Sequence, residues 1–458
     1  GEGGDRKGGR KRGRRDGDPT DSPRWRKVEP LARSMLGNTL NLLENLTDGR
    51  MVAFTLRKVR GLSALLLPFE RLVKKYMRHA LRLWGERAPA VRLQAILLVR
   101  QLAADGEGET LELALRGCYR TFAANSKFVS AASSMEHVAF MSACVVELYG
   151  LDTGAAYPHA FVHVRQLAML LRNALQAKTP AAFGAVYCWQ AVSCMEVWER
   201  VVSTHGPRKG DALHPLAYPL AQVVSGAARL LPSARHAPLR VRLLRLLNRL
   251  ARATGYYVPV AALAVELLEA AELKRKPLGA ADAKPKPGGA PQDLGSQLRV
   301  PKPELRSAAL HEFVVGSVCG VLAEHLEQWA YHPAFPELSW LPLRHLKEFS
   351  QATPVQRFRK QAQALAAAVE RSAEWVGRRR DAADFAPKDA ARVASFLRAE
   401  REAGQAPLSR YLAELRRDGE QAHALATVTD VKVADVRPRR GEAEEAERAF
   451  RAYDRDAA

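Results

Sequence analysis

The stretch PLRVRLLRLLNRLARATGYYVPV, residues 238–260, sets five arginines within a run of leucine, valine and alanine. On a helix of 3.6 residues per turn, four of the arginines fall within an arc of about 80° and the leucines cover the opposite side. These four are Arg242, Arg245, Arg249 and Arg252. Pro238 before the run, with Gly255 and Pro259 after it, are ordinary helix start and stop signals. The stretch therefore predicts one amphipathic helix whose broad apolar side needs neighbours on two sides.

Segments of the same kind fill most of the chain. From residue 30 to 273 the sequence is typical of helices of about 15–25 residues divided by proline or glycine, and no long alternation with period two predicts a sheet. Val-Arg pairs open three of these segments at Val91, Val164 and Val241, which are 73 and 77 residues apart. Each spacing is close to two helix pairs of about 37–40 residues, near the short end for HEAT repeats. We therefore expect an all-α fold, a HEAT/armadillo-like α-solenoid of stacked antiparallel helix pairs with disordered tails and one long loop.

Composition divides the chain into five parts. They are a disordered Gly/Arg-rich basic arm (1–29), an N-terminal helical-repeat region (30–273), a Pro/Gly/Lys-rich loop or linker (274–303), a C-terminal helical-repeat region (304–403) and a mixed-charge tail with short helices (404–458).

The net charge is concentrated in the part that is expected to fold. The 458 residues carry a formal charge of +21, of which residues 1–27 contribute +5 and residues 404–458 contribute −1, so that +17 remains on residues 28–403. A hydrophobic content of 47% is enough for a large core. A basic folded body indicates a polyanionic partner, with RNA or DNA favoured over a membrane.

The cysteines and the apolar segments point to a soluble cytosolic or nuclear protein. All five cysteines lie in apolar helical segments and none forms a CxxC pair, as expected of reduced, buried thiols. The longest apolar window, residues 181–198, contains Gln190 and Glu196 and favours a buried helix over a membrane span.

Signatures of catalysis are largely missing from the sequence. It contains no phosphate-binding GxxxxGK[ST] loop, no GxGxxG, no HExxH and no GxSxG. His159 and His163 share one helix face, but no cysteine or carboxylate cluster nearby would complete a metal site, so we interpret them as structural. Cys188 and Cys194 flank Trp189 in an apolar segment and are interpreted as core residues. We expect neither an enzyme nor a cofactor, metal or small-molecule substrate.

The basic clusters are the candidate nucleic-acid contacts. The flexible arm supplies Arg10, Lys11, Arg12, Arg14 and Arg15. Arg378, Arg379 and Arg380 end a helix, where they either complement its dipole or bind phosphate. The stripe of Arg242, Arg245, Arg249 and Arg252 is either a solvated face or a phosphate-binding one. Exposed aromatics with basic neighbours are not evident, so any binding is expected to follow backbone and shape. Reversal of Arg242, Arg245 and Arg249 to glutamate is expected to weaken binding without unfolding the chain.

Several ordered blocks of the sequence resemble the nucleolar complex protein 2 family, from about residue 40 to about residue 397. They include VVELYGLD (145–152), AYPHAFVHVRQLAMLLRNAL (156–175), VYCWQAVSCMEVWERVV (186–202), the block 216–260, AFPELSWLPLRHLKEFSQ (334–351) and DFAPKDAARVASF (384–396). The chain departs from the family in its Ala/Pro/Lys-rich loop at 274–303 and in a short N-terminal arm where the family has a long charged extension.

The resemblance implies a non-catalytic HEAT-like scaffold in the nucleolus and nucleoplasm. It implies a heterodimer with nucleolar complex protein 1 or nucleolar complex protein 3, acting on precursors of the large (60S) ribosomal subunit and on their pre-rRNA. A chromatin- or transcription-associated adaptor is the alternative, although histones are themselves basic and fit a +17 body less well. A transport receptor for basic cargo is disfavoured for a similar reason.

One further stretch is a candidate partner-binding edge. AFPEL, residues 334–338, is an irregular apolar stretch that is either a packing corner or an edge for a protein partner. Phe335 and Pro336 lie within it, and Trp329 and Trp340 on either side carry the same two interpretations.

Overall fold

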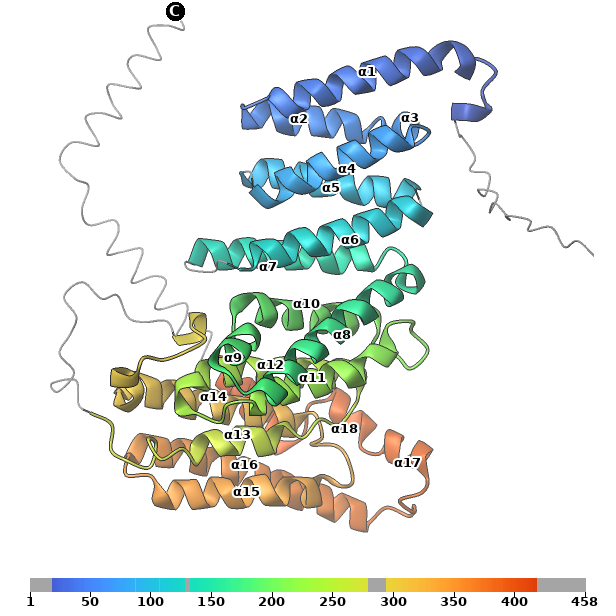
Figure 1. Cartoon of the computed structure of the whole chain (residues 1–458). Coiled ribbons are helices and arrows are strands. Elements are labelled where there is room, and N and C mark those ends of the chain that lie inside the picture. The colour runs from blue at the N-terminus through green and yellow to red at the C-terminus, as the bar shows by residue number, and fades with distance from the viewer. Residues whose placement is uncertain (1–18, 87, 107, 128–131, 279–293, 418–458) are drawn as a thin grey trace, which may run out of the picture. The chain divides into compact units, whose positions relative to one another are not determined.

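The computed structural model describes residues 19–86, 88–106, 108–127, 132–278 and 294–417, which are mostly helical (Figure 1). No β-strand is assigned within these ranges. The all-α prediction is confirmed. The chain divides into two compact units, unit 1 formed by residues 1–263 and 279–310, and unit 2 by residues 264–278 and 311–458.

Unit 1 holds the first twelve α-helices of the described residues. They are α1 (Trp25–Asn45), α2 (Gly49–Arg60), α3 (Ser63–Leu66), α4 (Glu70–Glu86), α5 (Pro89–Gly106), α6 (Gly108–Asn125), α7 (Ala132–Tyr149), α8 (Thr153–Ala177), α9 (Pro180–Val186), α10 (Trp189–His205), α11 (Ala217–Arg229) and α12 (Ala237–Thr254). The division between the units falls within α13 (Val260–Leu268) and α14 (Ala308–Glu327), and unit 2 continues with α15 (Phe335–Ala352), α16 (Gln356–Asp381), α17 (Ala390–Ser395) and α18 (Arg398–Glu402).

The long helices of unit 1 pack along two series of neighbours. In one series α1 contacts α4, α4 contacts α6, α6 contacts α8 and α8 contacts α11. The other consists of two runs, in which α2 contacts α5, and α7 contacts α10, which contacts α12. Two contacts show that α4 and α6 run parallel. Lys74 pairs with Glu109 near the starts of the two helices, and Leu81 meets Gly117 further along both. A Cβ at Gly117 would overlap Leu81 Cδ1, so the glycine permits this close approach.

The three Val-Arg segments do not occupy equivalent places in this packing. Val164 lies on α8, in the series that contains α4 and α6, whereas Val91 on α5 and Val241 on α12 lie outside that series. Their sequence spacing is therefore not the spacing of equivalent helices. Facing residues of α4 and α6 give a shorter interval, since Lys74 and Glu109 are 35 residues apart and Leu81 and Gly117 are 36 apart.

Helix α12 forms where the sequence predicts it, over Ala237–Thr254. Its leucines at 239, 243, 244, 246, 247 and 250 are all at most 1% exposed. The helix ends at Gly255, whose positive φ of 71° suits glycine and whose amide donates to the carbonyl of Ala251. The fifth arginine of the stretch, Arg240, is also buried and donates to the carbonyl oxygen of Leu263 at 3.4 Å.

Large aromatic residues fill the core of unit 1, and the hydroxyls of Tyr76 and Tyr149 donate to backbone carbonyls. Trp84, Tyr76, Tyr149 and Trp198 are fully buried. The hydroxyl of Tyr76 donates to the carbonyl of Leu36 at 2.7 Å, which joins α4 to α1. These contacts bury aromatic surface without leaving a phenol unpaired.

The apolar window at 181–198 is not one continuous helix. Helix α9 ends at Val186, and α10 begins at Trp189, so the chain turns at Tyr187 and Cys188. Among the described residues, one helix, α14, has the length and composition that would suit a membrane span, and 67% of its most apolar window is buried inside the protein. Burial of this kind is typical of a core helix.

Two segments that composition assigns to a loop and to a tail with short helices contain residues that pack into a core. Part of the predicted loop at 274–303 packs onto unit 1, where Val300 is fully buried and its amide donates to the carbonyl of Arg235 at 2.8 Å. In unit 2 the helical core continues beyond residue 403, because residues 407–417 are helical and Leu408 is fully buried. In both places one or two apolar side chains within a polar segment reach a core.

Ion pairs join α15 and α16 of unit 2 into an antiparallel pair. Lys347 bonds Glu370 at 2.8 Å, and Arg380 near the end of α16 bonds Glu337 near the start of α15 at 2.7 Å. The residues 407–417 attach to this unit through the hydroxyl of Ser372, which accepts from the amide of Leu408 at 2.8 Å.

We predict that acidification destabilises unit 2 through His325 of α14. Burial lowers the pKa of this fully buried histidine from 6.5 to about 4. The unfolded chain therefore binds a proton near pH 6.5 that the folded chain does not bind until about pH 4, so stability is present above pH 6.5 and is lost as the pH falls. Between pH 7 and pH 5 the loss is about 2 kcal/mol.

Urea denaturation of the unmodified chain and of the His325→Leu variant at both pH values measures this effect. The variant should lose about 2 kcal/mol less on acidification. An equal loss in the two proteins would contradict the assignment to His325.

Candidate nucleic-acid and partner surfaces

The arginine side of α12 is only partly open to solvent. Arg245, Arg249 and Arg252 are exposed, and Arg242 is half-buried with 25% of its side chain exposed. The leucines of the same helix face the core, as the sequence predicts. The stripe therefore has the predicted orientation, and its chemistry depends on what each guanidinium contacts.

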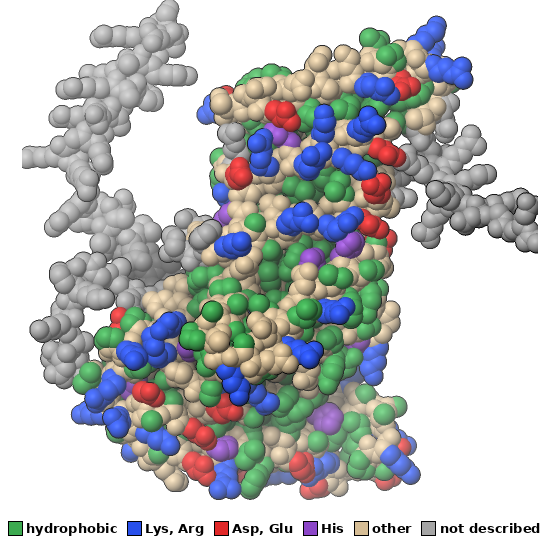
Figure 2. All heavy atoms as spheres, in the orientation of Figure 1, with side chains coloured by type: hydrophobic (Ala, Val, Ile, Leu, Met, Phe, Trp, Pro, Cys, Tyr) green, Lys and Arg blue, Asp and Glu red, His purple; other side chains and the backbone are tan. Residues whose placement is uncertain are grey.

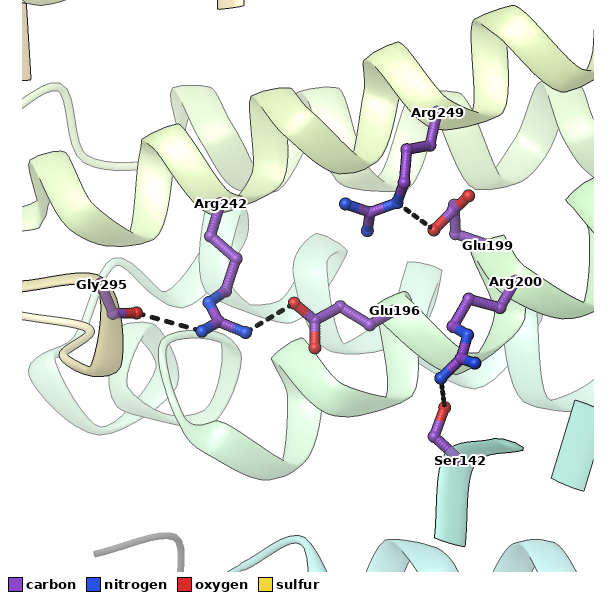
Figure 3. A network of polar contacts seen from close by, with 7 residues as sticks. All are labelled: Ser142, Glu196, Glu199, Arg200, Arg242, Arg249 and Gly295. Atoms are coloured by element: carbon purple, nitrogen blue, oxygen red, sulfur yellow. Dashed lines mark hydrogen bonds and ion pairs between the residues drawn. The ribbon is translucent and has the colours of Figure 1, made fainter. Parts of the chain in front are cut away.

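Arg242 contacts three groups of unit 1, and Figure 3 shows two of them, Glu196 and Gly295. Its Nη1 donates to Glu196 Oε1 of α10 at 2.8 Å, and its Nη2 donates to the carbonyl oxygen of Gly295 at 3.1 Å. The guanidinium carbon also lies 5.1 Å from the ring centroid of Trp189. These contacts join α12, α10 and the segment around Gly295, so Arg242 stabilises the packing of unit 1.

Arg249 neutralises a buried carboxylate. Its Nε donates to Glu199 Oε2 of α10 at 3.0 Å, and only 1% of the Glu199 side chain is exposed (Figure 3). The hydroxyl of Ser203 donates to the other oxygen, Oε1, at 2.9 Å. Burial raises the pKa of Glu199 above its usual value, and Arg249 and Ser203 counteract that rise. A carboxylate in such a place is costly without its cation.

The sequence leaves two interpretations of the stripe, a solvated face and a phosphate-binding face. These contacts add a third, in which an arginine pairs with a carboxylate of the same chain. Arg242 and Arg249 meet carboxylates of the same chain, which are 46 and 50 residues away in the sequence. The expectation that Arg242 and Arg249 can be reversed to glutamate without damage to the fold is therefore wrong, since each reversal would place a carboxylate beside a carboxylate. Phosphate binding at Arg245 and Arg252 stays a prediction.

The arginines that end α16 differ in their surroundings. Arg380 donates from Nη1 to Glu337 Oε1 at 2.7 Å and to the carbonyl of Pro333 at 3.1 Å. Arg379 lies over the ring of Trp375 at 4.1 Å. Arg378 is the most exposed of the three, and it meets only Glu374 of its own helix at 3.9 Å. Thus Arg380 ties α16 to α15, and Arg378 presents the freest charge of the group.

The candidate partner edge separates into buried and exposed residues. Phe335 is fully buried and begins α15, with Pro336 in the first turn, so AFPEL is a helix start rather than an irregular stretch. Trp329 and Pro336 are half-buried. Trp340 has 61% of its surface exposed, beside Leu341 at 49%. The packing interpretation fits Phe335, and the partner interpretation fits Trp340.

His163 and Cys194 have structural surroundings, whereas Cys188, expected in the core, is half-buried at the turn before α10. The His163 ring lies 3.9 Å from the ring of Tyr119, and its Nδ1 is 3.0 Å from Gln166 Oε1. Burial raises the pKa of the Cys194 thiol to about 11, which is opposite to the activation of a nucleophile. Across the described ranges, no group of three or more His, Cys, Asp and Glu side chains is placed to hold a metal ion.

Helix α4 carries a second basic stripe, which was not predicted from the sequence. Arg71, Lys75, Arg78 and Arg82 are all exposed. Their spacing of four, three and four residues was the available signal, because it places all four on one side of a helix. The arm residues Arg10, Lys11, Arg12, Arg14 and Arg15 lie outside the described residues.

Comparison with known proteins identifies relatives over most of the chain. The model of the Noc2p family matches residues 109–415. Nucleolar complex-associated protein 2 of Arabidopsis thaliana is 39% identical over 91% of this chain and 53% of its own length. Protein REBELOTE of the same plant is 28% identical over 85% of this chain and 64% of its own. Nucleolar complex protein 2 of Drosophila melanogaster is 29% identical over 81% of this chain and 48% of its own length. The chain thus spans between about half and two thirds of the length of these relatives.

We predict that Arg249→Ala lowers the free energy of unfolding by about 1–3 kcal/mol, because it leaves the buried Glu199 carboxylate without its cation. In a Glu199→Gln background the same substitution should cost much less, since no buried charge remains. Urea denaturation of the two single variants and the double variant measures this coupling.

Arg172→Ala, at an exposed arginine of α8 in the same unit, is the control, with an expected change within about 0.5 kcal/mol. An Arg249→Ala cost that is unchanged by Glu199→Gln would show that the pair does not account for it.

Proposed function

Since the chain belongs to the Noc2p family, we propose that it is a non-catalytic scaffold in the assembly, maturation and intranuclear transport of large (60S) ribosomal subunit precursors. The observation that carries the proposal is the family match over residues 109–415. Relatives whose names place them in nucleolar complexes support a location in the nucleolus, and we extend the proposal to the nucleoplasm.

We propose that the helices of unit 1 form an α-solenoid of the HEAT type. Two series of contacting helices support this arrangement. The parallel packing of α4 and α6, with facing residues 35 or 36 apart, is what neighbouring repeats of a solenoid require. Such a fold offers long lateral surfaces and needs no catalytic pocket.

The protein partner is proposed to be nucleolar complex protein 1 or nucleolar complex protein 3, bound as a heterodimer. The relatives named as nucleolar complex proteins support a partner of this kind. An exposed apolar surface is needed for it, and Trp340 with Leu341 provides one on α15.

Pre-rRNA is the proposed nucleic-acid partner. The net charge of +17 on residues 28–403 supports a polyanion. The alternative role as a chromatin or transcription adaptor is less well supported, because a basic body repels histones.

We predict that the tagged chain, expressed in cells of its own species, co-purifies with rRNA precursors of the large subunit. RNA sequencing of the eluate measures the enrichment, and small-subunit precursors in the same eluate are the control. Recovery of RNA should decrease as salt in the wash increases, because phosphate contacts release counterions. An eluate without enrichment of large-subunit precursors, or one enriched in chromatin, would contradict the proposal.

A further inference from the structure

Four exposed cations form one line along α4. Arg71 and Arg82 are eleven positions apart, which is about 16 Å along the helix axis, and Lys75 and Arg78 lie between them. The opposite side of the helix is buried in unit 1, with Tyr76 fully inaccessible. The line therefore lies on the outer surface of unit 1.

The four cations keep their charge for an outside partner. None of them has a carboxylate partner among the described residues. Arg78 donates from Nε to the carbonyl of Lys74 at 3.3 Å, and Arg82 Nη2 lies 3.1 Å from His79 Nδ1, contacts within α4 that leave each guanidinium mostly open. The acidic residues of the helix, Glu70 and Glu86, stand at its two ends.

Helix α6 extends the same surface. Lys74, at the edge of the α4 line, pairs with Glu109 of α6 at 2.6 Å. Glu109 shares a helix side with the exposed Arg116 and Arg120, so the two lines face the same way. Arg116 is paired only weakly, with Glu112 at 3.5 Å. Figure 2 shows Lys and Arg side chains gathered over the part of unit 1 where Figure 1 draws α4 and α6.

The α4 and α6 surface differs from the arginine stripe of α12 in how much positive charge is left unpaired for a phosphate. On α12, Glu196 and Glu199 already occupy two of the four arginines. On α4 all four members are exposed, so none of their charge is used to compensate a buried carboxylate. Long-range attraction of a polyanion depends on this uncompensated charge.

The composition of the surface favours nucleic acid over protein. The large hydrophobic residues with substantial exposure include Phe161, Val162 and Met169 on α8, but none on α4 or α6. Protein interfaces need apolar or aromatic anchors at their centre. Stacking of unpaired bases needs exposed aromatics, which this surface also lacks.

We propose that the exposed cations of α4 and α6, namely Arg71, Lys75, Arg78, Arg82, Arg116 and Arg120, bind the phosphate backbone of a folded RNA. This inference rests on the proposed function and assigns the RNA contact to a particular surface of unit 1. Recognition at this surface follows charge and shape and does not read the base sequence.

The test compares two full-length variants that lose the same charge. Arg71→Gln, Lys75→Gln, Arg78→Gln and Arg82→Gln are combined in the α4 variant. The control variant combines Lys360→Gln, Arg371→Gln, Lys388→Gln and Arg410→Gln, four exposed cations of unit 2. Fluorescence anisotropy measures binding of a labelled RNA hairpin between about 50 and about 200 mM salt, with poly-glutamate as a competitor. Circular dichroism checks that both variants are folded.

The α4 variant should bind the hairpin at least about tenfold more weakly, and the slope of log affinity against log salt should decrease by up to about 3. The control variant should bind within about threefold of the unmodified chain, and poly-glutamate should compete poorly. Equal weakening by both variants would show that the loss of binding depends only on net charge, and would overturn the assignment of RNA binding to the α4 surface. Strong competition by poly-glutamate would instead favour an acidic protein and overturn it as well.

Hairpin binding by the unmodified chain and by the α4 variant distinguishes a failure of the α4 site from a failure of the proposed RNA contact. If the unmodified chain does not bind the hairpin at any salt concentration, the proposed RNA contact itself fails. If the unmodified chain binds and the folded α4 variant binds equally well, the RNA contact stands and the α4 surface is excluded as its site.

Discussion

The structure of unit 1 depends on the burial of a broad apolar side of each long helix between two neighbours. Helix α12 is the clearest case, because six leucines that cover about half of its circumference are at most 1% exposed. A single partner helix cannot cover such a side, so α12 packs against both α10 and α11. Each helix is left with a narrow polar side, and the basic residues of the chain accumulate there.

The contacts of these polar sides decide which arginines are available to a partner. On α12 the neighbouring α10 carries Glu196 and Glu199, and two arginines neutralise them. On α4 the neighbouring α6 offers Glu109, which pairs with Lys74 at the edge and leaves the centre of the line open. A similar spacing of cations along two helices thus leads to a structural role in one and to an exposed basic surface in the other.

Features of the fold that depend on the local sequence pattern could be predicted from the sequence. The helical class, the bounds of α12 to within two residues, and its inward leucines all follow from periodicity and from Pro238 and Gly255. The partners of Arg242 and Arg249 could not be predicted, because Glu196 and Glu199 lie 46 and 50 residues away and meet them only after α10 and α12 pack. For the same reason the burial of Val300 and Leu408, within segments that look like a linker and a tail, becomes evident only in the folded chain.

The most direct test of a basic α4 and α6 surface within a ribosome-assembly scaffold is a map of RNA–protein cross-links. Ultraviolet cross-linking of the tagged chain in purified large-subunit precursors, followed by mass spectrometry of the linked peptides, gives this map. We predict cross-linked peptides from residues 70–86 and 108–125, and fewer from residues 237–254. A map with cross-links on α12 and none on α4 or α6 would contradict it.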